Sequence, residues 1–272
     1  MNAEEIHKHW VNWANEFGKD LRATTRTSTA KILEVDALAR VISSTGLDQQ
    51  NASVLEVGCG NGHNCFELAK IFPNFTFTGI DYVQEMIDAA EALKSELNVT
   101  RTRFSRGDVL RISDSIVGDE QFDIVFTVRC LINLNSHELQ IQALDQLISK
   151  VKPGGRLILI ENSKLTHGNQ NDLRASVGLD RRKPAEFNRF LDEDEFVAHA
   201  SKSLTLVGRE DFSSLHDLIL YVLVPMINEG KIDYAHPLVH AATRLSIETS
   251  RQFNQAFGPF GQNRLLHFAK KK

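Results

Sequence analysis

Three alternating glycines follow an acidic residue in the first third of the chain. The run Val54-Leu55-Glu56-Val57 leads into Gly58-Cys59-Gly60-Asn61-Gly62, and an amphipathic segment follows. This order is typical of a strand, a tight turn and a helix, in which backbone N–H groups of the turn approach a ligand. A dinucleotide-binding turn requires G-x-G-x-x-G, but His63 stands at the third glycine position. The pattern therefore favours a nucleotide-type turn that differs from the dinucleotide one.

Acidic residues also follow the next two predicted strands, where an open parallel sheet binds its ligand. Asp81 lies about 20 residues past the glycines, which suits a carboxylate that accepts hydrogen bonds from two ribose hydroxyls. Tyr82 and Met86 are predicted to pack against an adenine. Further on, Gly107-Asp108-Val109 offers a carboxylate for the adenine amino group and a backbone N–H for a ring nitrogen.

Alternating strands and helices position these residues. The hydrophobic pattern predicts strands at 53–57, 76–81, 102–106, 122–128, 156–161, 204–212 and 264–269. It predicts helices at 1–17, from residue 28 or 29, at 63–72, around Met86–Leu97, at 136–151 and at 192–201. The second helix should place Ile32, Val35, Ala39 and Ile42 on one face, and Asn135 and Glu138 are spaced as a capping box. Mostly continuous apolar strands predict a parallel sheet covered on both faces.

Two segments are less regular. Residues 162–189 are expected to form a long polar loop, and residues 213–262 to be mostly helical, with breaks at Pro225, Pro237 and Pro259. We expect a single domain, 1–272. It divides into an N-terminal helical cap (1–45), a core (46–212), a helical insertion on the substrate side (213–262) and a last strand with its tail (263–272).

Five motifs in this order resemble the class I S-adenosylmethionine (SAM) methyltransferases. They are the glycine turn, Asp81, the Gly107-Asp108 pair, the Phe122-Asp123-Ile124-Val125 strand and the Lys152-Pro153-Gly154-Gly155 turn. The resemblance implies a Rossmann-like, seven-stranded, mostly parallel α/β sheet whose last strand is antiparallel. It also implies SAM as cofactor and S-adenosylhomocysteine (SAH) as product. The implied cofactor residues are Glu56, Gly58, Cys59, Gly60, Asn61, Asp81, Tyr82, Met86, Gly107, Asp108, Val109, Val128 and Arg129.

Methyl transfer asks for alignment of the acceptor and, for a hydroxyl acceptor, for a base. The candidate bases are Glu161, His167 and His236, and the candidate substrate contacts are Arg22, Arg26, Asn133, Tyr221 and Tyr234. For each of them a plainer alternative stays open: an ion pair for Glu161, and a surface or substrate-orienting role for the histidines. The loop at 23–29 and the segment at 130–134 resemble a bacterial subgroup that methylates small molecules or sugars.

Composition limits the remaining classes. A net charge of −4 over 272 residues does not require a large basic face, so nucleic acid is not an expected partner, although a local basic patch stays open. No apolar run reaches the length of a membrane span. The three cysteines, Cys59, Cys65 and Cys130, lack metal-site spacing and suggest reduced thiols in a cytoplasm, so no metal is expected. No signal peptide is visible. The oligomeric state stays open, a homodimer included.

The sequence therefore predicts a cytoplasmic SAM-dependent methyltransferase that acts on an oxygen or nitrogen of a small molecule. A sugar or sugar nucleotide of surface-glycan biosynthesis is one candidate substrate. Two alternatives remain: an NAD(P)-dependent oxidoreductase and a non-catalytic SAM-binding protein.

Overall fold

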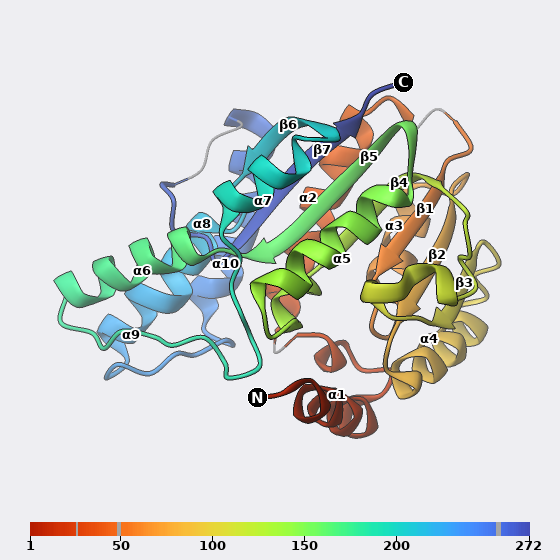
Figure 1. The fold of residues 1–272 in the computed structure, drawn as a ribbon. Coiled ribbons are helices and arrows are strands. Elements are labelled where there is room, and N and C mark those ends of the chain that lie inside the picture. The colour runs from red at the N-terminus through yellow and green to blue at the C-terminus, as the bar shows by residue number, and fades with distance from the viewer. Residues whose placement is uncertain (26, 48–49, 254–256) are drawn as a thin grey trace.

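One sheet organises the chain (Figure 1). The computed structural model describes residues 1–25, 27–47, 50–253 and 257–272. Within them, the strands form a seven-stranded sheet in the order β3-β2-β1-β4-β5-β7-β6. The strands are β1 (Ser53–Val57), β2 (Thr76–Asp81), β3 (Thr102–Arg106), β4 (Phe122–Val128), β5 (Val151–Asn162), β6 (Leu204–Glu210) and β7 (Asn263–Lys270). Neighbours from β3 to β5 pair in parallel, and β7 is antiparallel to β5 and β6. The predicted fold class is confirmed.

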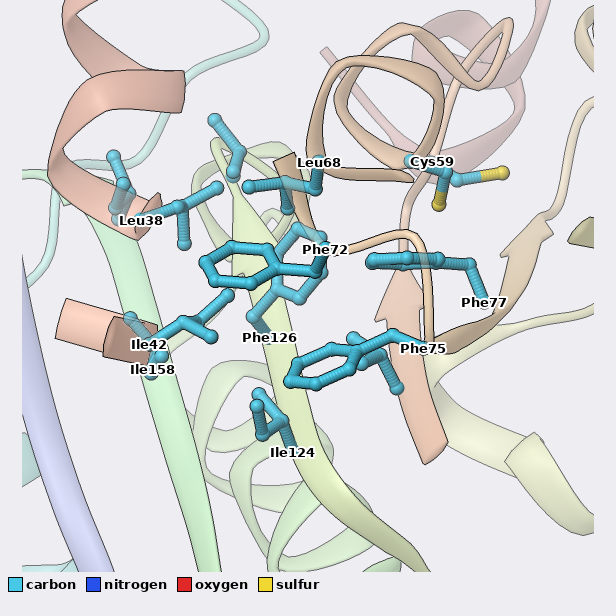
Figure 2. Packing of buried hydrophobic residues seen from close by; sticks show 14 of the residues in the cluster. Leu38, Ile42, Cys59, Leu68, Phe72, Phe75, Phe77, Ile124, Phe126 and Ile158 are labelled. Carbon is cyan, nitrogen blue, oxygen red and sulfur yellow. The ribbon is translucent and has the colours of Figure 1, made fainter. Parts of the chain in front are cut away.

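Alternate residues of the strands feed two separate cores, one on each face of the sheet. Val54 packs with α2 (Ser28–Ser44), α3 (His63–Ile71) and α4 (Gln84–Leu97), whereas Leu55 packs with α5 (His137–Ser149) and α7 (Glu193–Ala200). Figure 2 shows the first core, where Phe72, Phe75 and Phe77 gather under α2 and α3. Replacing one such buried phenylalanine with alanine lowers the free energy of unfolding by about 3–5 kcal/mol. Both faces of the sheet are therefore fixed, and its strand ends are held in place.

The helix α1 (Ala3–Phe17) lies at the carboxyl ends of the strands, beside α4 (Figure 1). Its start is a capping box, in which Asn2 Oδ1 accepts from Glu5 N (2.9 Å) and Glu5 Oε2 accepts from Asn2 N (2.7 Å). Its inner face packs on Val83 and Met86 in a small separate cluster. A short 3₁₀ helix (Leu21–Ala23) then leads into α2. The predicted helix at 1–17 is confirmed.

The long polar loop expected at 162–189 is wrong in its first half, which forms α6 (Lys164–Ser176). Ser163 caps this helix. The buried face is polar and is satisfied by hydrogen bonds: Gln170 Nε2 donates to Phe260 O (3.0 Å) and Arg174 Nε donates to Asp180 O (2.8 Å). Because these side chains are not apolar, the helix carries no hydrophobic stripe that its sequence could reveal.

The segment 213–262 is mostly helical where it is described, as predicted. It contains α8 (Ser214–Leu218), a π-helical turn (Ile219–Leu223), α9 (Val224–Ile227) and α10 (Pro237–Phe253). Pro237 begins α10, but Pro225 does not break the helix as expected. Pro225 lies in the first turn of α9, directly after the π turn, where the proline ring and its missing N–H are tolerated.

Two local predictions need correction. Ser136, not Asn135, caps α5, because its Oγ accepts from Leu139 N (3.2 Å). The strand β5 begins at Val151 and includes the residues expected as a turn, Lys152-Pro153-Gly154-Gly155. These residues interrupt the regular pairing with β4, since the register shifts between the pair Val151–Phe122 and the pair Arg156–Ile124. None of the described helices is long and apolar enough to cross a membrane.

Candidate functional site

A cavity of about 460 Å³ opens at the carboxyl ends of β1 to β4, as expected for an open parallel sheet. Every predicted cofactor residue except Glu56 and Asn61 lines it. The strand ends contribute Gly58, Asp81, Gly107 and Val128, while α1 contributes its inner face. Sequence motifs more than 70 residues apart therefore meet at one site.

The glycine turn leaves no room for a Cβ at its three glycine positions. Gly58, Gly60 and Gly62 have φ values of +75°, +53° and +80°, which favour glycine. A Cβ on Gly58 would lie 2.6 Å from Cys130 Sγ, and one on Gly62 would lie 2.7 Å from the Phe104 ring. The turn can therefore bring its backbone against a ligand only with glycine at these positions.

Asp81 holds this turn and also lines the cavity. One carboxylate oxygen accepts from Gly60 N (2.8 Å) and the other from Val83 N (3.0 Å). Burial raises the pKa of Asp81, while the backbone donors oppose the rise. Asp108 is more exposed; its Oδ1 caps the short 3₁₀ helix Val109–Asp114 by accepting from Leu110 N (2.9 Å). Each carboxylate keeps lone pairs for a ligand.

Glu56 and Asn61 support the site from behind. Glu56 is fully buried and accepts from Asn64 Nδ2 (2.6 Å) and Cys65 Sγ (3.1 Å), and burial raises its pKa to about 7. Asn61 Nδ2 donates to the carbonyl oxygens of Gly18 (3.0 Å) and Asp20 (2.9 Å). Asn61 therefore ties the glycine turn to the segment that follows α1.

Two cations on the cavity wall share one buried carboxylate. Arg129 Nε donates to Glu34 Oε1 (2.7 Å), and Lys31 Nζ lies 3.2 Å from Glu34 Oε2 and 3.0 Å from Asn64 Oδ1. Desolvation lowers the pKa of Lys31, and the Glu34 charge opposes that. The sequence reasoning missed Lys31 because it assigned the buried face of α2 to Ile32. The structure instead leaves Ile32 half exposed and buries Lys31 and Glu34. The signal in the sequence that could have revealed this pair is the spacing of Lys31 and Glu34, which places a lysine and a glutamate one helical turn apart.

The three candidate bases lie off the cavity lining. Glu161 is buried under the turn after β4, with four donors on its carboxylate. His167 packs edge-on against Phe190, and burial lowers its pKa to about 4. His236 Nδ1 accepts from Leu238 N (3.2 Å) at the start of α10.

Of the candidate substrate contacts, Asn133 lines the cavity. Tyr221 and Tyr234 pack together in the insertion, where the Arg182 guanidinium lies 3.5 Å from the centre of the Tyr221 ring. Arg22 pairs with Asp20 at the surface (2.8 Å). Arg26 lies outside the described residues. The structure thus brings Asn133 to the predicted cofactor residues and leaves Tyr221, Tyr234 and Arg22 elsewhere.

The inner face of α1, part of the predicted N-terminal cap, supplies cavity residues that were not among the candidate site residues. His7 and Trp10 line the cavity opposite Tyr82, and the rings of His7 and Tyr82 meet edge-on at 5.1 Å. The helical spacing of Ile6 and Trp10 indicated a buried face in a cap expected over the active site, but it did not indicate which side chains would contact the cavity. Among the described residues, no group of three His, Cys, Asp or Glu side chains is arranged to hold a metal ion.

Comparison with known proteins decides the family. A family model described as a methyltransferase domain matches residues 48–208, more than half of the chain. The chain belongs to the class I SAM-dependent methyltransferases. The cofactor of this family is SAM, which agrees with the prediction from the motifs.

Relatives of this methyltransferase act on varied substrates by name. Over 122 residues it is 30% identical to the demethylmenaquinone methyltransferase of Deinococcus radiodurans, covering 45% of this chain and 48% of that protein. Over 154 residues it is 27% identical to the trans-aconitate 2-methyltransferase of the same organism, covering 57% of this chain and 55% of that protein. The chain thus spans about half the length of these curated relatives.

Solved structures share the methyltransferase fold. The magnesium protoporphyrin IX methyltransferase of Synechocystis PCC 6803, with bound SAH, matches with a TM-score of 0.57 at 14% identity, covering 89% of this chain and 84% of that one. The N-methyltransferase NodS of Bradyrhizobium japonicum matches with a TM-score of 0.54 at 13% identity, over 98% and 99% of the two chains. The [4+2]-cyclase SpnF matches with a TM-score of 0.54 at 17% identity, over 87% and 81%. At these identities the likeness concerns the fold alone.

Proposed function

We propose that this protein transfers a methyl group from SAM to an oxygen or nitrogen of a small molecule. The observation that carries the proposal is the cavity itself. It places Gly58 and Gly60 of the glycine turn, the buried Asp81 and the more exposed Asp108 around one space at the strand ends. A volume of about 460 Å³ lies in the range of cofactor pockets.

The chemistry of the lining residues fits SAM. Asp81 would accept hydrogen bonds from the ribose hydroxyls, and Asp108 from the adenine amino group, with Tyr82 and Met86 against the ring. At the other end, Lys31 has three N–H donors and two acceptors nearby, which leaves one for a carboxylate. When bound, SAM supplies a methyl group already activated on a sulfonium.

We propose that alignment, rather than a dedicated base, is the main contribution of the chain to methyl transfer. Glu161, His167 and His236 lie off the cavity lining, whereas Arg129 and Asn133 are on it. Holding an acceptor in line can lower the barrier by roughly 7–11 kcal/mol. Arg129 and Asn133 are therefore proposed to position the acceptor under α1.

The candidate acceptors include compounds other than sugars. Relatives are named for a quinone and a tricarboxylic acid, and a sugar or sugar nucleotide stays our candidate from the sequence alone. The three free cysteines support a reducing, cytoplasmic setting.

Calorimetric titration with SAM tests the proposal through Asp81. We expect Asp81→Asn to weaken SAM binding about tenfold, because an amide cannot accept the same hydrogen bonds as a carboxylate. Asp119→Asn, at an exposed aspartate away from the cavity, is the matched control and should bind as the wild type does. Unchanged affinity in Asp81→Asn would contradict the assignment of Asp81.

A second candidate is a SAM-binding protein that performs no methyl transfer. The [4+2]-cyclase SpnF, which shares the fold, supports this candidate, since that protein is named for a different reaction. Release of SAH during incubation with candidate acids, quinones and sugars separates the two. Thermal shift by NAD(H) but not SAM would favour the oxidoreductase instead.

A further inference from the structure

Glu161 carries the densest set of hydrogen bonds at the strand ends, although it does not line the cavity. Oε1 accepts from Thr127 Oγ1 (2.9 Å), Cys130 N (3.0 Å) and Leu131 N (3.1 Å), and Oε2 accepts from Ile132 N (3.3 Å). The side chain is only 3% exposed. Three consecutive backbone N–H groups therefore converge on one buried carboxylate.

The backbone of the turn after β4 creates the need for this anion. β4 and β5 pair in parallel as far as Val128 and Ile160, and Arg129 N donates to Ile160 O (2.7 Å). Arg129 then adopts a φ of +54°, which is rare for a residue with a side chain. This reversal directs the next three N–H groups toward Glu161. Successive N–H groups form a concave positive site that a carboxylate satisfies.

The same turn forms one wall of the cavity. Arg129, Cys130 and Asn133 all line it. Cys130 also lies close against the glycine turn, since a Cβ on Gly58 would lie 2.6 Å from its thiol. A displacement of this turn would therefore reach both the acceptor-side residues and the glycine turn.

We infer that Glu161 is a positioning residue of this methyltransferase, whose carboxylate holds the 129–133 turn in the geometry that completes the cavity. This inference rests on the proposed function, and it replaces a role for Glu161 as the base. The left-handed backbone of Arg129 costs free energy, and the charge-assisted hydrogen bonds to Glu161 offset that cost.

A residue with a purely structural role would lower stability and leave the folded cavity unchanged. Measurements of the folded cavity, made well below the melting temperature, distinguish a positioning role from a purely structural one. Two probes report on it: the dissociation constant of SAH by calorimetry, and the alkylation rate of Cys130 by iodoacetamide, followed by peptide mass spectrometry. Cys130 is partly exposed, whereas Cys59 and Cys65 are buried.

Glu161→Gln keeps the size of the side chain, but its amide NH2 group then faces a backbone N–H group and cannot accept the hydrogen bond that the carboxylate accepts. We expect it to weaken SAH binding about fivefold, the loss of one hydrogen bond, and to speed alkylation of Cys130 roughly threefold as the turn opens locally. Glu161→Ala, which removes all four acceptor contacts, should exceed both effects if it folds. Restoring the carboxylate one carbon shorter, in Glu161→Asp, should recover part of the SAH affinity.

Glu193→Gln is the matched control. Glu193 is also a buried carboxylate (5% exposed), paired with Arg264 at 3.1 Å, but it lies outside the cavity lining. The Glu193→Gln variant should have a lower melting temperature than the wild type. Its SAH affinity and its rate of Cys130 alkylation should stay near the wild-type values. The inference is overturned if Glu161→Gln shows the same pattern as Glu193→Gln. If the wild type itself does not bind SAH, the proposed function fails instead.

Discussion

Gly58 shows how a single hydrogen atom in place of a side chain shapes the cavity. We predict that Gly58→Ala destabilises the fold and weakens SAH binding, because the new methyl group would overlap Cys130. Overpacking of this kind costs about 1–3 kcal/mol, in addition to the strain at φ +75°. Urea unfolding and SAH calorimetry measure the two effects.

Gly46→Ala provides the control for backbone strain alone. Gly46 has a similar φ of +73°, but a Cβ there meets nothing within 4 Å. We expect it to cost roughly 1 kcal/mol with no change in SAH affinity. Equal losses of stability and affinity in the two variants would show that contact with Cys130 is not what requires glycine at position 58.

Residue types at strand ends were predictable wherever a motif fixes their spacing. Asp81 ends β2 and Asp108 lies two residues after β3, so their place at the cavity followed from sheet topology alone. Glu56 lies just before the glycine turn, but its side chain points into the core toward Asn64. Motif spacing alone does not tell on which face of the strand a side chain lies. Lys31 was missed because a buried lysine resembles a surface residue until its partners are known.

At the scale of elements, the connection between α1 and α2 depends on one side chain of the glycine turn. We predict that Asn61→Ala loosens α1, because two carbonyl oxygens, of Gly18 and Asp20, lose their donor. The cost should be about 1–3 kcal/mol. Hydrogen exchange in residues 3–17 should accelerate, and SAH affinity should fall because α1 forms part of the cavity wall.

Asn74→Ala, at an exposed asparagine in the turn before β2, is the corresponding control and should leave exchange in α1 unchanged. If α1 exchanges equally slowly in both variants, packing on Val83 and Met86 is sufficient to hold it.

Elements with apolar periodicity were predicted well, and those held by polar contacts were not. The strands β1 to β4 match their predicted bounds, because their core-facing residues are apolar. The helix α6 was missed, since Gln170 and Arg174 occupy its buried face and their acceptors lie in distant segments. Such long-range partners are a property of the fold and leave no local pattern.

At the scale of the whole molecule, buried carboxyl groups set a dependence of stability on pH. Burial raises the pKa of Glu56, Glu161 and Asp211 to about 7. The folded state then binds more protons than the unfolded state between the ordinary carboxyl pKa and 7, so the free energy of unfolding falls as the pH rises through 7. We predict a loss of roughly 2 kcal/mol between pH 6.5 and 8 from the three groups together.

Two histidines oppose this trend at lower pH. Burial lowers the pKa of His167 and His267 to about 4, so their stabilising contribution is lost as the pH falls from 6.5 toward 4. Urea unfolding at pH 6.5, 7.0, 7.5 and 8.0 isolates the carboxyl contribution. Stability that is constant or rises over this interval would contradict the prediction, and Glu161→Gln should flatten the slope.

The antiparallel course of β7 has a practical consequence for anyone purifying this protein. Because β7 runs antiparallel to β5, the chain leaves the sheet at the end of the strands that lies away from the cavity, and Figure 1 shows the two ends of the chain on opposite sides. Ala3 and Glu4, in contrast, line the cavity. An affinity tag fused before Met1 would therefore lie near the cavity, whereas a tag after Lys272 would lie away from it.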